Sequence, residues 1–176
     1  MKHSIKLWSF WGFAVTSLVG TLLHFLYEWT GNSILVAPFS AVNESIFEHM
    51  KLLFFPLLFF ALVQSRFFQD QKNFWCIKLK TVLLGIFLIP ALYYLYNGAI
   101  GKSPDFVNIA IFFITAAIVF FAEAKLLEGR ASAKVSPTVS LIALATLAVL
   151  FIIFTFFPLT LPLFQDPTTR AYGIPM

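Results

Sequence analysis

Two short stretches of the chain concentrate the side chains that could do chemistry. His24 and Glu28 are four residues apart, and Glu44 and Glu48 are four residues apart with His49 directly after them. If each stretch is helical, each four-residue pair shares one helix face, and His49 lies about 100° round from Glu48. Neutral imidazole together with carboxylate suits zinc, iron or manganese. The two stretches therefore predict one divalent-metal site, provided that they lie side by side.

In this hypothesis the groups take separate roles. The four expected metal ligands are His24, Glu28, Glu44 and His49. Glu48 is the expected general base, acting on metal-bound water in the hydrolysis of a membrane-associated substrate. The polar residues expected around the same pocket are Asn43, Lys51, Asp166 and Arg170. The spacing matches no standard ligand motif, so the pattern leaves open whether the protein is an enzyme.

A purely structural role for the same residues is the main alternative. Ser45-Ile46-Phe47-Glu48 fits a capping box, in which Glu48 only satisfies backbone donors at the start of a helix. Lys51, three residues further on, could pair with Glu48. His24 could be a hydrogen-bonded group between two helices. The protein would then be a structural or accessory membrane subunit.

Two further functions remain open from the residues. A proton- or cation-coupled transporter or channel could use Glu44, Glu48 and His24 as relay groups. It needs polar residues deeper in the membrane, and few are found there. A haem between His24 and His49 is disfavoured by the charged and amide side chains around them.

The segment that follows these residues is short for a membrane span. From Leu52 to Ser65 fourteen residues carry no charge, which is about 21 Å of helix. A bilayer core is about 30 Å thick and needs about 20 residues. If the segment crosses the membrane, the helix must also include the residues before Leu52. Glu48, His49 and Lys51 would then lie at or inside the membrane boundary. An ionisable residue at that depth is a functional-site hypothesis by default.

Composition places the whole chain in a membrane. Of its 176 residues 60% are hydrophobic and only 11% are charged, whereas a soluble domain carries about 25% charged residues. Mean hydropathy is +0.87. The basic residues lie at the ends of apolar segments, so the excess of positive charge does not indicate nucleic acid. The one partner that the composition predicts is the lipid bilayer; neither a substrate nor an oligomeric state follows from it.

The apolar pattern predicts an all-α integral membrane protein, a bundle of five transmembrane helices forming a single domain over residues 1–176. The expected spans are approximately 5–27, 43–65, 76–97, 105–127 and 139–161. In the first span small or polar residues recur every four positions along a face expected to pack on protein: Gly12, Thr16, Gly20, His24 and Glu28. At the end of the fourth span Glu123, Lys125 and Glu128 are expected to form a solvated rim.

The distribution of basic residues predicts the orientation. With the N-terminus inside and the C-terminus outside, nine Lys and Arg fall on the inner side and three on the outer side, Lys51, Lys102 and Arg170. The His/Glu stretches then face outward. We expect a polar pocket between the first two spans, roofed by the loop over residues 29–42 and by the tail around Asp166 and Arg170.

Several blocks of the chain carry a resemblance to a known family. They are residues 22–29, the stretch Ala41–Lys51 with its Asn-Glu-Ser sequence, and the closing residues 165–167 and 172–173. Together they resemble an uncharacterised family of small bacterial and archaeal membrane proteins, a domain of unknown function. The resemblance implies a multi-pass protein of the prokaryotic cytoplasmic (inner) membrane. It implies no activity and supplies no catalytic residues.

Overall fold

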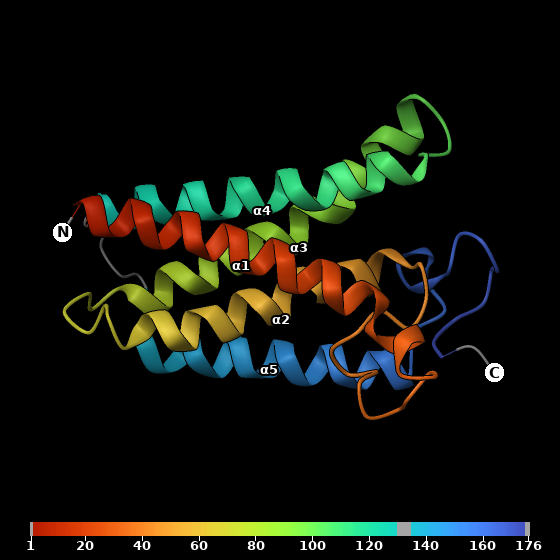
Figure 1. The fold of residues 1–176 in the computed structure, drawn as a ribbon, viewed down its shortest axis with the longest axis horizontal. Helices are drawn as coiled ribbons and strands as arrows, with labels where there is room; N and C mark the ends of the chain where they lie inside the picture. The colour runs from red at the N-terminus through yellow and green to blue at the C-terminus, as the bar shows by residue number, and fades with distance from the viewer. Residues whose placement is uncertain (1, 130–134, 175–176) are drawn as a thin grey trace.

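Five long helices lie side by side and make up most of the protein (Figure 1). The computed structural model describes residues 2–129 and 135–174. The helices are α1 (Lys2–Trp29), α2 (Ile46–Ser65), α3 (Phe74–Ala99), α4 (Asp105–Glu128) and α5 (Pro137–Phe156), followed by a short 3-10 helix, η1 (Pro162–Phe164). Each of the five long helices has the length and apolar composition to cross a membrane. The prediction of an all-helical chain with five such helices is confirmed within the described residues.

Most helix boundaries differ from the predicted spans by one to five residues, and two of these differences have a local cause in the sequence. α2 begins at Ile46 and not at residue 43, because the Ser45 hydroxyl caps it by accepting the Glu48 backbone N–H. α5 ends at Phe156 and not at residue 161, because Pro158 disfavours helical geometry at the residue before it. The 20 residues of α2 span about 30 Å, so its length does include the charged residues before Leu52.

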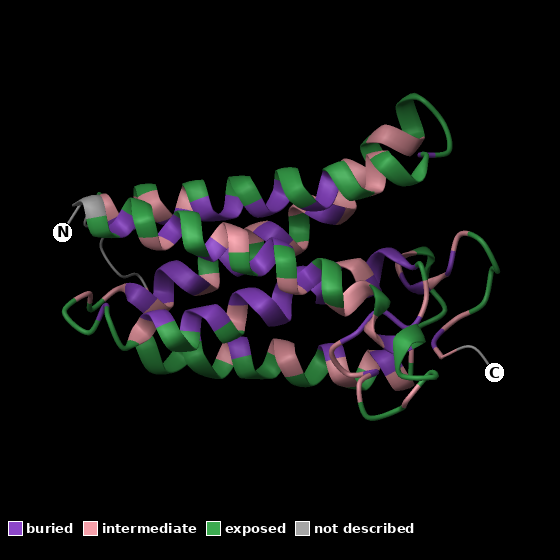
Figure 2. Cartoon of the chain, viewed as in Figure 1, coloured by how far each residue is buried: buried purple, intermediate pink, exposed green. Residues whose placement is uncertain are grey.

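α2 is the central helix of the bundle. Fourteen of its 20 residues are buried, whereas α5 buries four of its 20. α1 packs on α2 and α4, and α3 packs on α2, α4 and α5. Rings of Phe47 and Phe54 lie 4.8–5.1 Å from that of Phe151, and each such pair contributes about 0.5–1.5 kcal/mol beyond its buried area. Figure 2 shows the buried residues concentrated where the helices face one another.

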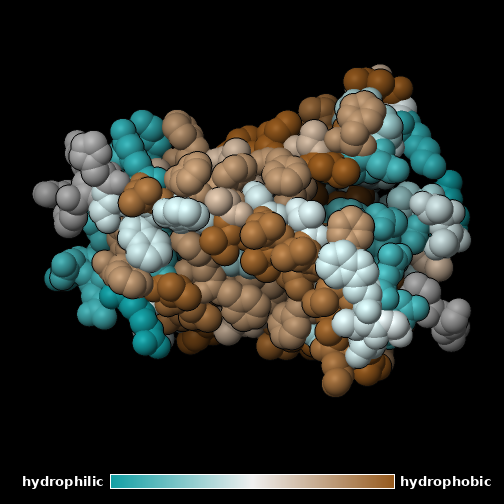
Figure 3. Space-filling view, viewed as in Figure 1, coloured by the Kyte–Doolittle hydropathy of each residue, from teal (hydrophilic) through white to brown (hydrophobic). Residues whose placement is uncertain are grey.

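The outward faces of the helices also carry many apolar side chains. Phe10, Leu18 and Phe87 are more than 60% exposed, and Figure 3 shows hydrophobic residues over the middle of the molecule with hydrophilic ones towards its two ends. A helix that is hydrophobic all round is typical of a membrane span.

The small-residue face of α1 packs on protein as predicted, up to Gly20. Gly12, Thr16 and Gly20 are buried. A Cβ at Gly20 would lie 2.6 Å from the Phe112 ring and 2.7 Å from the Leu52 carbonyl oxygen, so a glycine is required for α1 to approach α2 and α4 this closely. Each four-residue step turns about 40° beyond a full turn. The face therefore drifts, and Glu28 is exposed.

The expected solvated rim at the end of α4 is wrong for Glu123. Its carboxylate is fully buried and forms an ion pair with Lys78 of α3, which is also fully buried. Gln64 of α2 donates to the same carboxylate at 3.1 Å. These groups come from three helices at the end of the bundle that carries the N-terminus (Figure 1).

Candidate metal centre

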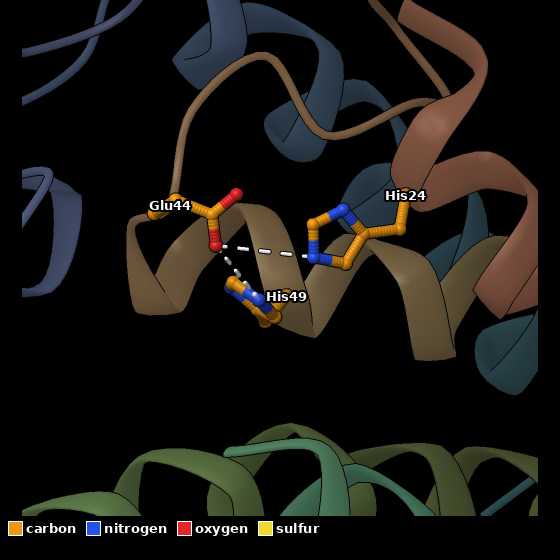
Figure 4. Close-up of side chains that lie close together, drawn as sticks. All are labelled: His24, Glu44 and His49. Atoms are coloured by element: carbon orange, nitrogen blue, oxygen red, sulfur yellow. Dashed lines mark ion pairs between the residues drawn. The ribbon is translucent and has the colours of Figure 1, made fainter. Parts of the chain in front are cut away.

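Three of the predicted ligands come together at the opposite end of the bundle. His24 comes from the last turns of α1, His49 from the first turn of α2, and Glu44 from the loop before α2. The Oε2 atom of Glu44 lies 3.8 Å from His24 Nε2 and 3.6 Å from His49 Nε2. Figure 4 shows both imidazoles directed at this one carboxylate oxygen. The three ligand atoms all lie within 4.8 Å of one another.

These separations are close to those of a bound metal. In a tetrahedral zinc site with bonds of about 2.0–2.1 Å, ligand atoms lie about 3.3–3.5 Å apart. The two distances to Glu44 are only slightly longer, and all three atoms lie within 4.8 Å of one another, so a metal ion would require the three side chains to move closer together. Three protein ligands leave a fourth position open, which is the arrangement of catalytic zinc sites rather than structural ones.

The ring of His49 is fixed by a backbone hydrogen bond. Its Nδ1 atom lies 2.9 Å from the Ser45 carbonyl oxygen. Because a carbonyl only accepts, Nδ1 carries the proton, and the lone pair of the neutral ring lies on Nε2, which faces Glu44. A lone pair opposite a carboxylate is unfavourable, and either a proton on Nε2 or a metal ion between the two groups relieves it. Metal-bound histidines ordinarily donate their second ring N–H in this way.

Asp166 in the C-terminal tail holds the backbone of Glu44 in place. One of its carboxylate oxygens accepts the Glu44 N–H at 3.3 Å, and the other accepts those of Thr168 and Thr169 at 2.7 and 3.0 Å. Burial on its own would raise the pKa of Asp166, but these backbone donors outweigh it and keep the pKa below its usual range. Asn43 adds a second link to the tail by donating to the Gly173 carbonyl at 2.8 Å.

The structure does not bring Glu48, the expected general base, to the three-residue group. Glu48 is 2% exposed, and its Oε2 atom lies 2.6 Å from the Lys51 ammonium. Lys51 also donates to the Ala37 carbonyl and to the Thr155 hydroxyl, and Glu48 accepts the Val42 N–H. This buried ion pair therefore fastens the loop that carries Glu44 to α2 and α5.

Glu28 and Arg170 also lie outside the group. Glu28 is exposed one turn beyond His24. Arg170 is exposed, and its backbone N–H donates to the Asp166 carbonyl oxygen at 2.9 Å. The other predicted pocket residues, Asn43, Lys51 and Asp166, form the hydrogen bonds described above, which hold the loop before α2 and the C-terminal tail in place.

A cavity of about 480 Å³ is lined in part by His24, Glu44 and His49. One wall is formed by α1 and α2, and the other by α3, α4 and the loop between them. Lys102, Asp105 and Asn108 on the second wall are polar, whereas the interior residues Leu52, Ile89, Ile111 and Phe112 are apolar. Figure 3 shows a recess where the end of the α3–α4 pair diverges from the rest of the molecule.

The predicted roof of this pocket is only partly correct. Tail residues Pro167 and Thr168 line the cavity, but no described residue of 29–42 does so. That loop is instead held against α1 by Ser40. The Ser40 hydroxyl accepts the Tyr27 N–H and donates to the Leu23 carbonyl oxygen. The predicted orientation places Asp105 and Asn108 at the same end of the bundle as the His/Glu stretches, but a wall formed by α3 and α4 was not part of the expected pocket. Its sequence signal is the polar group over residues 102–108, which follows the third apolar span.

Comparison with known proteins places the chain in a family. Residues 1–174 match a family model described as a family of unknown function (DUF6512). The chain belongs to this family. The resemblance seen in the sequence blocks is thus confirmed over nearly the whole chain. No curated protein and no solved structure matches it significantly. Any function must therefore be argued from the site.

Proposed function

We propose that this member of the family is an integral membrane protein that binds one divalent metal ion through His24, Glu44 and His49. The observation that carries the proposal is the meeting of two imidazole nitrogens and one carboxylate oxygen from three separate segments. The Ser45 carbonyl supports it by directing the His49 lone pair at Glu44. Two nitrogens and one oxygen suit zinc best, with iron and manganese as further candidates.

The chemistry that this donor set favours is hydrolysis. A metal held by two imidazoles and one carboxylate supplies an acidified water and polarises the bond to be cut. Hydrolysis adds one water across that bond, and the leaving oxygen takes up a proton. Within the described part of the cavity wall, Asp105 is the carboxylate outside the ligand group. It replaces Glu48 as our candidate general base, and the substrate is a compound of the membrane.

We further propose that the metal end faces outward across the prokaryotic inner membrane, with the N-terminus inside. Lys51 and Lys78 are buried in ion pairs, so they do not act as surface orientation signals. Without these two lysines, the predicted inner side carries eight Lys and Arg residues and the outer side two, instead of nine and three, so the bias remains. In a variant whose Cys76 is replaced, a single cysteine at Gly101 should react with an impermeant maleimide in intact cells. A single cysteine at Gln69 should react only after lysis.

Metal analysis of protein purified without chelator tests the main proposal. We expect about one zinc, iron or manganese ion per chain, and loss of that ion in the His24→Ala/His49→Ala double variant. Glu28→Gln is the matched control, because Glu28 is on the same helix as His24 but outside the group. Absence of stoichiometric metal, or retention of it by the double variant, would contradict the proposal.

A proton- or cation-coupled transporter is the second candidate, favoured by a specific observation. Buried polar groups occur at both ends of the bundle, and the Thr16 and Thr115 hydroxyls inside it have no hydrogen-bond partner among the described residues. Against it, about 20 Å of α2 separates Lys51 from Gln64, and the residues between them are apolar. Flux into liposomes that depends strongly on pH and is lost in both Glu48→Gln and Glu123→Gln would favour transport over the metal site.

A further inference from the structure

We propose that the cavity beside the metal centre holds one membrane lipid with a phosphate headgroup, which enters sideways from the bilayer. The headgroup lies against His24, Glu44, His49 and Lys102, and an acyl chain lies between α1 and α4. The inference rests on the proposed function, because the metal ion provides much of the positive charge that recognises the phosphate.

The lining of the cavity is divided as an amphiphile requires. Its polar side chains lie at the end that meets the α3–α4 loop and the C-terminal tail. Leu52, Ile89 and Phe112 make its interior apolar. Its volume of about 480 Å³ falls within the range of roughly 300–1,000 Å³ found for small-molecule sites. A free ion or a polar metabolite would leave the apolar part of this cavity without a partner, whereas an acyl chain fills it.

The cavity is open along the side of the bundle. α1 and α4 are in close contact near Gly12, where an added Cβ would clash with the Phe120 ring. Towards the cavity, residues of both helices line it and are also exposed: Thr21 and Phe25 on α1, and Ile109 and Phe113 on α4. These exposed apolar faces are the ones that would contact lipid. Figure 3 shows the recess on this side of the molecule. A lipid could therefore enter without leaving the bilayer.

The charges around the cavity favour an anionic head. A divalent ion together with Lys102 outweighs Glu44 and Asp105, so the metal-loaded cavity carries a net positive charge. α4 also begins here, and its N-cap residue Pro104 provides no side-chain cap for the first backbone N–H groups. The positive end of the helix dipole and these N–H groups favour phosphate at the same place.

Binding measurements on the whole protein, purified and loaded with zinc in neutral detergent, test the inference. The probe is lysophosphatidic acid, with inorganic phosphate and a monoacylglycerol of the same chain length as the two other arms. We expect lysophosphatidic acid to bind at least about tenfold more tightly than either. We expect Ile109→Trp, which fills the opening, to weaken this binding by about tenfold. Ile114→Trp is the matched control, since Ile114 is a similarly exposed isoleucine of α4 outside the cavity lining.

Two results would overturn the lipid site. One is binding of inorganic phosphate as tight as that of lysophosphatidic acid, and the other is equal lipid binding by the Ile109→Trp and Ile114→Trp variants. Zinc titration of the same samples separates this claim from the proposed function. Full zinc binding without lipid preference overturns the lipid site alone, whereas failure to bind zinc overturns the metal centre together with the headgroup recognition that depends on it.

Discussion

The polar groups at the two ends of the bundle differ in how completely their charges are satisfied. Lys78 and Glu123 are fully buried, with Gln64 donating to the carboxylate and three phenylalanine rings 5.4–5.9 Å from the ammonium. At the other end the side chain of Glu44 is 51% exposed, and its nearest oxygen is 3.6 Å or more from either imidazole. The charges of the first group are paired within it, although Gln64 Oε1 has no hydrogen-bond partner among the described residues, and the Glu44 carboxylate of the second group has no such close cation. On our proposal, this difference separates a group that stabilises the fold from one that binds a metal ion.

The largest expected effect is on the free energy of unfolding, at the end of the bundle that holds the buried Lys78–Glu123 pair. Removing one partner of a buried ion pair leaves an uncompensated charge and costs about 3–5 kcal/mol, whereas replacing both partners by apolar residues is often neutral. Lys78→Met and Glu123→Leu should therefore each destabilise the protein strongly, and the double variant should recover most of the loss. Reversible unfolding in detergent measures this. A double variant as unstable as the worse single one would show that the pair has a further role.

At the end that carries His24, Glu44 and His49 we expect a large effect on zinc binding and a small one on stability. His24→Ala and His49→Ala should each lower zinc affinity at least about a hundredfold, because each removes one of the three proposed protein ligands. The free energy of unfolding of the metal-free protein should change by less than about 1 kcal/mol, since these side chains are partly exposed. Zinc titration and unfolding of the same samples check both values. Loss of stability without loss of zinc would reverse the distinction between the two ends.

A smaller effect is expected where the tail positions Glu44. Asp166→Asn should weaken zinc binding by about tenfold, in the range observed for groups that orient metal ligands. The reason is that the Glu44 N–H and the turn at Thr168 both depend on the Asp166 carboxylate. Asp70→Asn is the control, an exposed aspartate at the other end of the bundle. Equal zinc affinity in the two variants would show that the loop holds Glu44 without the tail.

Acidification should separate the metal centre from the tail. Zinc should be released as the pH falls, because a metal ligand must be deprotonated to bind. The pKa of Asp166 is lower in the folded chain than in the unfolded one, so its bonds stabilise the tail above the ordinary aspartate value of about 3.9. That stabilisation is lost only as the pH falls through the lower, folded value. NMR shifts of the Thr168 and Thr169 amides should therefore stay constant while zinc is released; a simultaneous change would contradict this.

The smallest effect is expected for Glu28→Gln. Glu28 is exposed and lies outside the ligand group, so both zinc affinity and the free energy of unfolding should stay within about 0.5 kcal/mol of the unchanged protein. A clear loss of zinc would show that Glu28 moves in as a fourth ligand when metal binds, and that the site is closed rather than open.

Much of the fold and part of the site could be predicted from the sequence. The five helices follow from runs of apolar residues, which need no knowledge of packing. The meeting of His24, Glu44 and His49 follows from placing two polar stretches at one end of adjacent antiparallel helices. Glu28 could not be excluded without the helix geometry, because a four-residue spacing only approximates one turn.

The remaining errors concern contacts between residues distant in the chain. Glu123 and Lys78 are 45 positions apart, and each alone resembled a surface charge near a helix end. Glu48 was expected in the pocket, but its partners Thr155 and Val42 lie in other segments. A usable signal was that Glu123 follows Phe120, Phe121 and Ala122 directly, where a charge needs a buried partner.

X-ray absorption spectroscopy of the zinc-loaded protein is the most direct test of the metal centre. Our account predicts two imidazole ligands and one carboxylate oxygen at about 2.0–2.2 Å, with one further light atom from water. In His49→Ala the imidazole count should fall from two to one, while Glu28→Gln should leave the spectrum unchanged. A spectrum without imidazole ligands, or one that is the same in His49→Ala, would contradict the account.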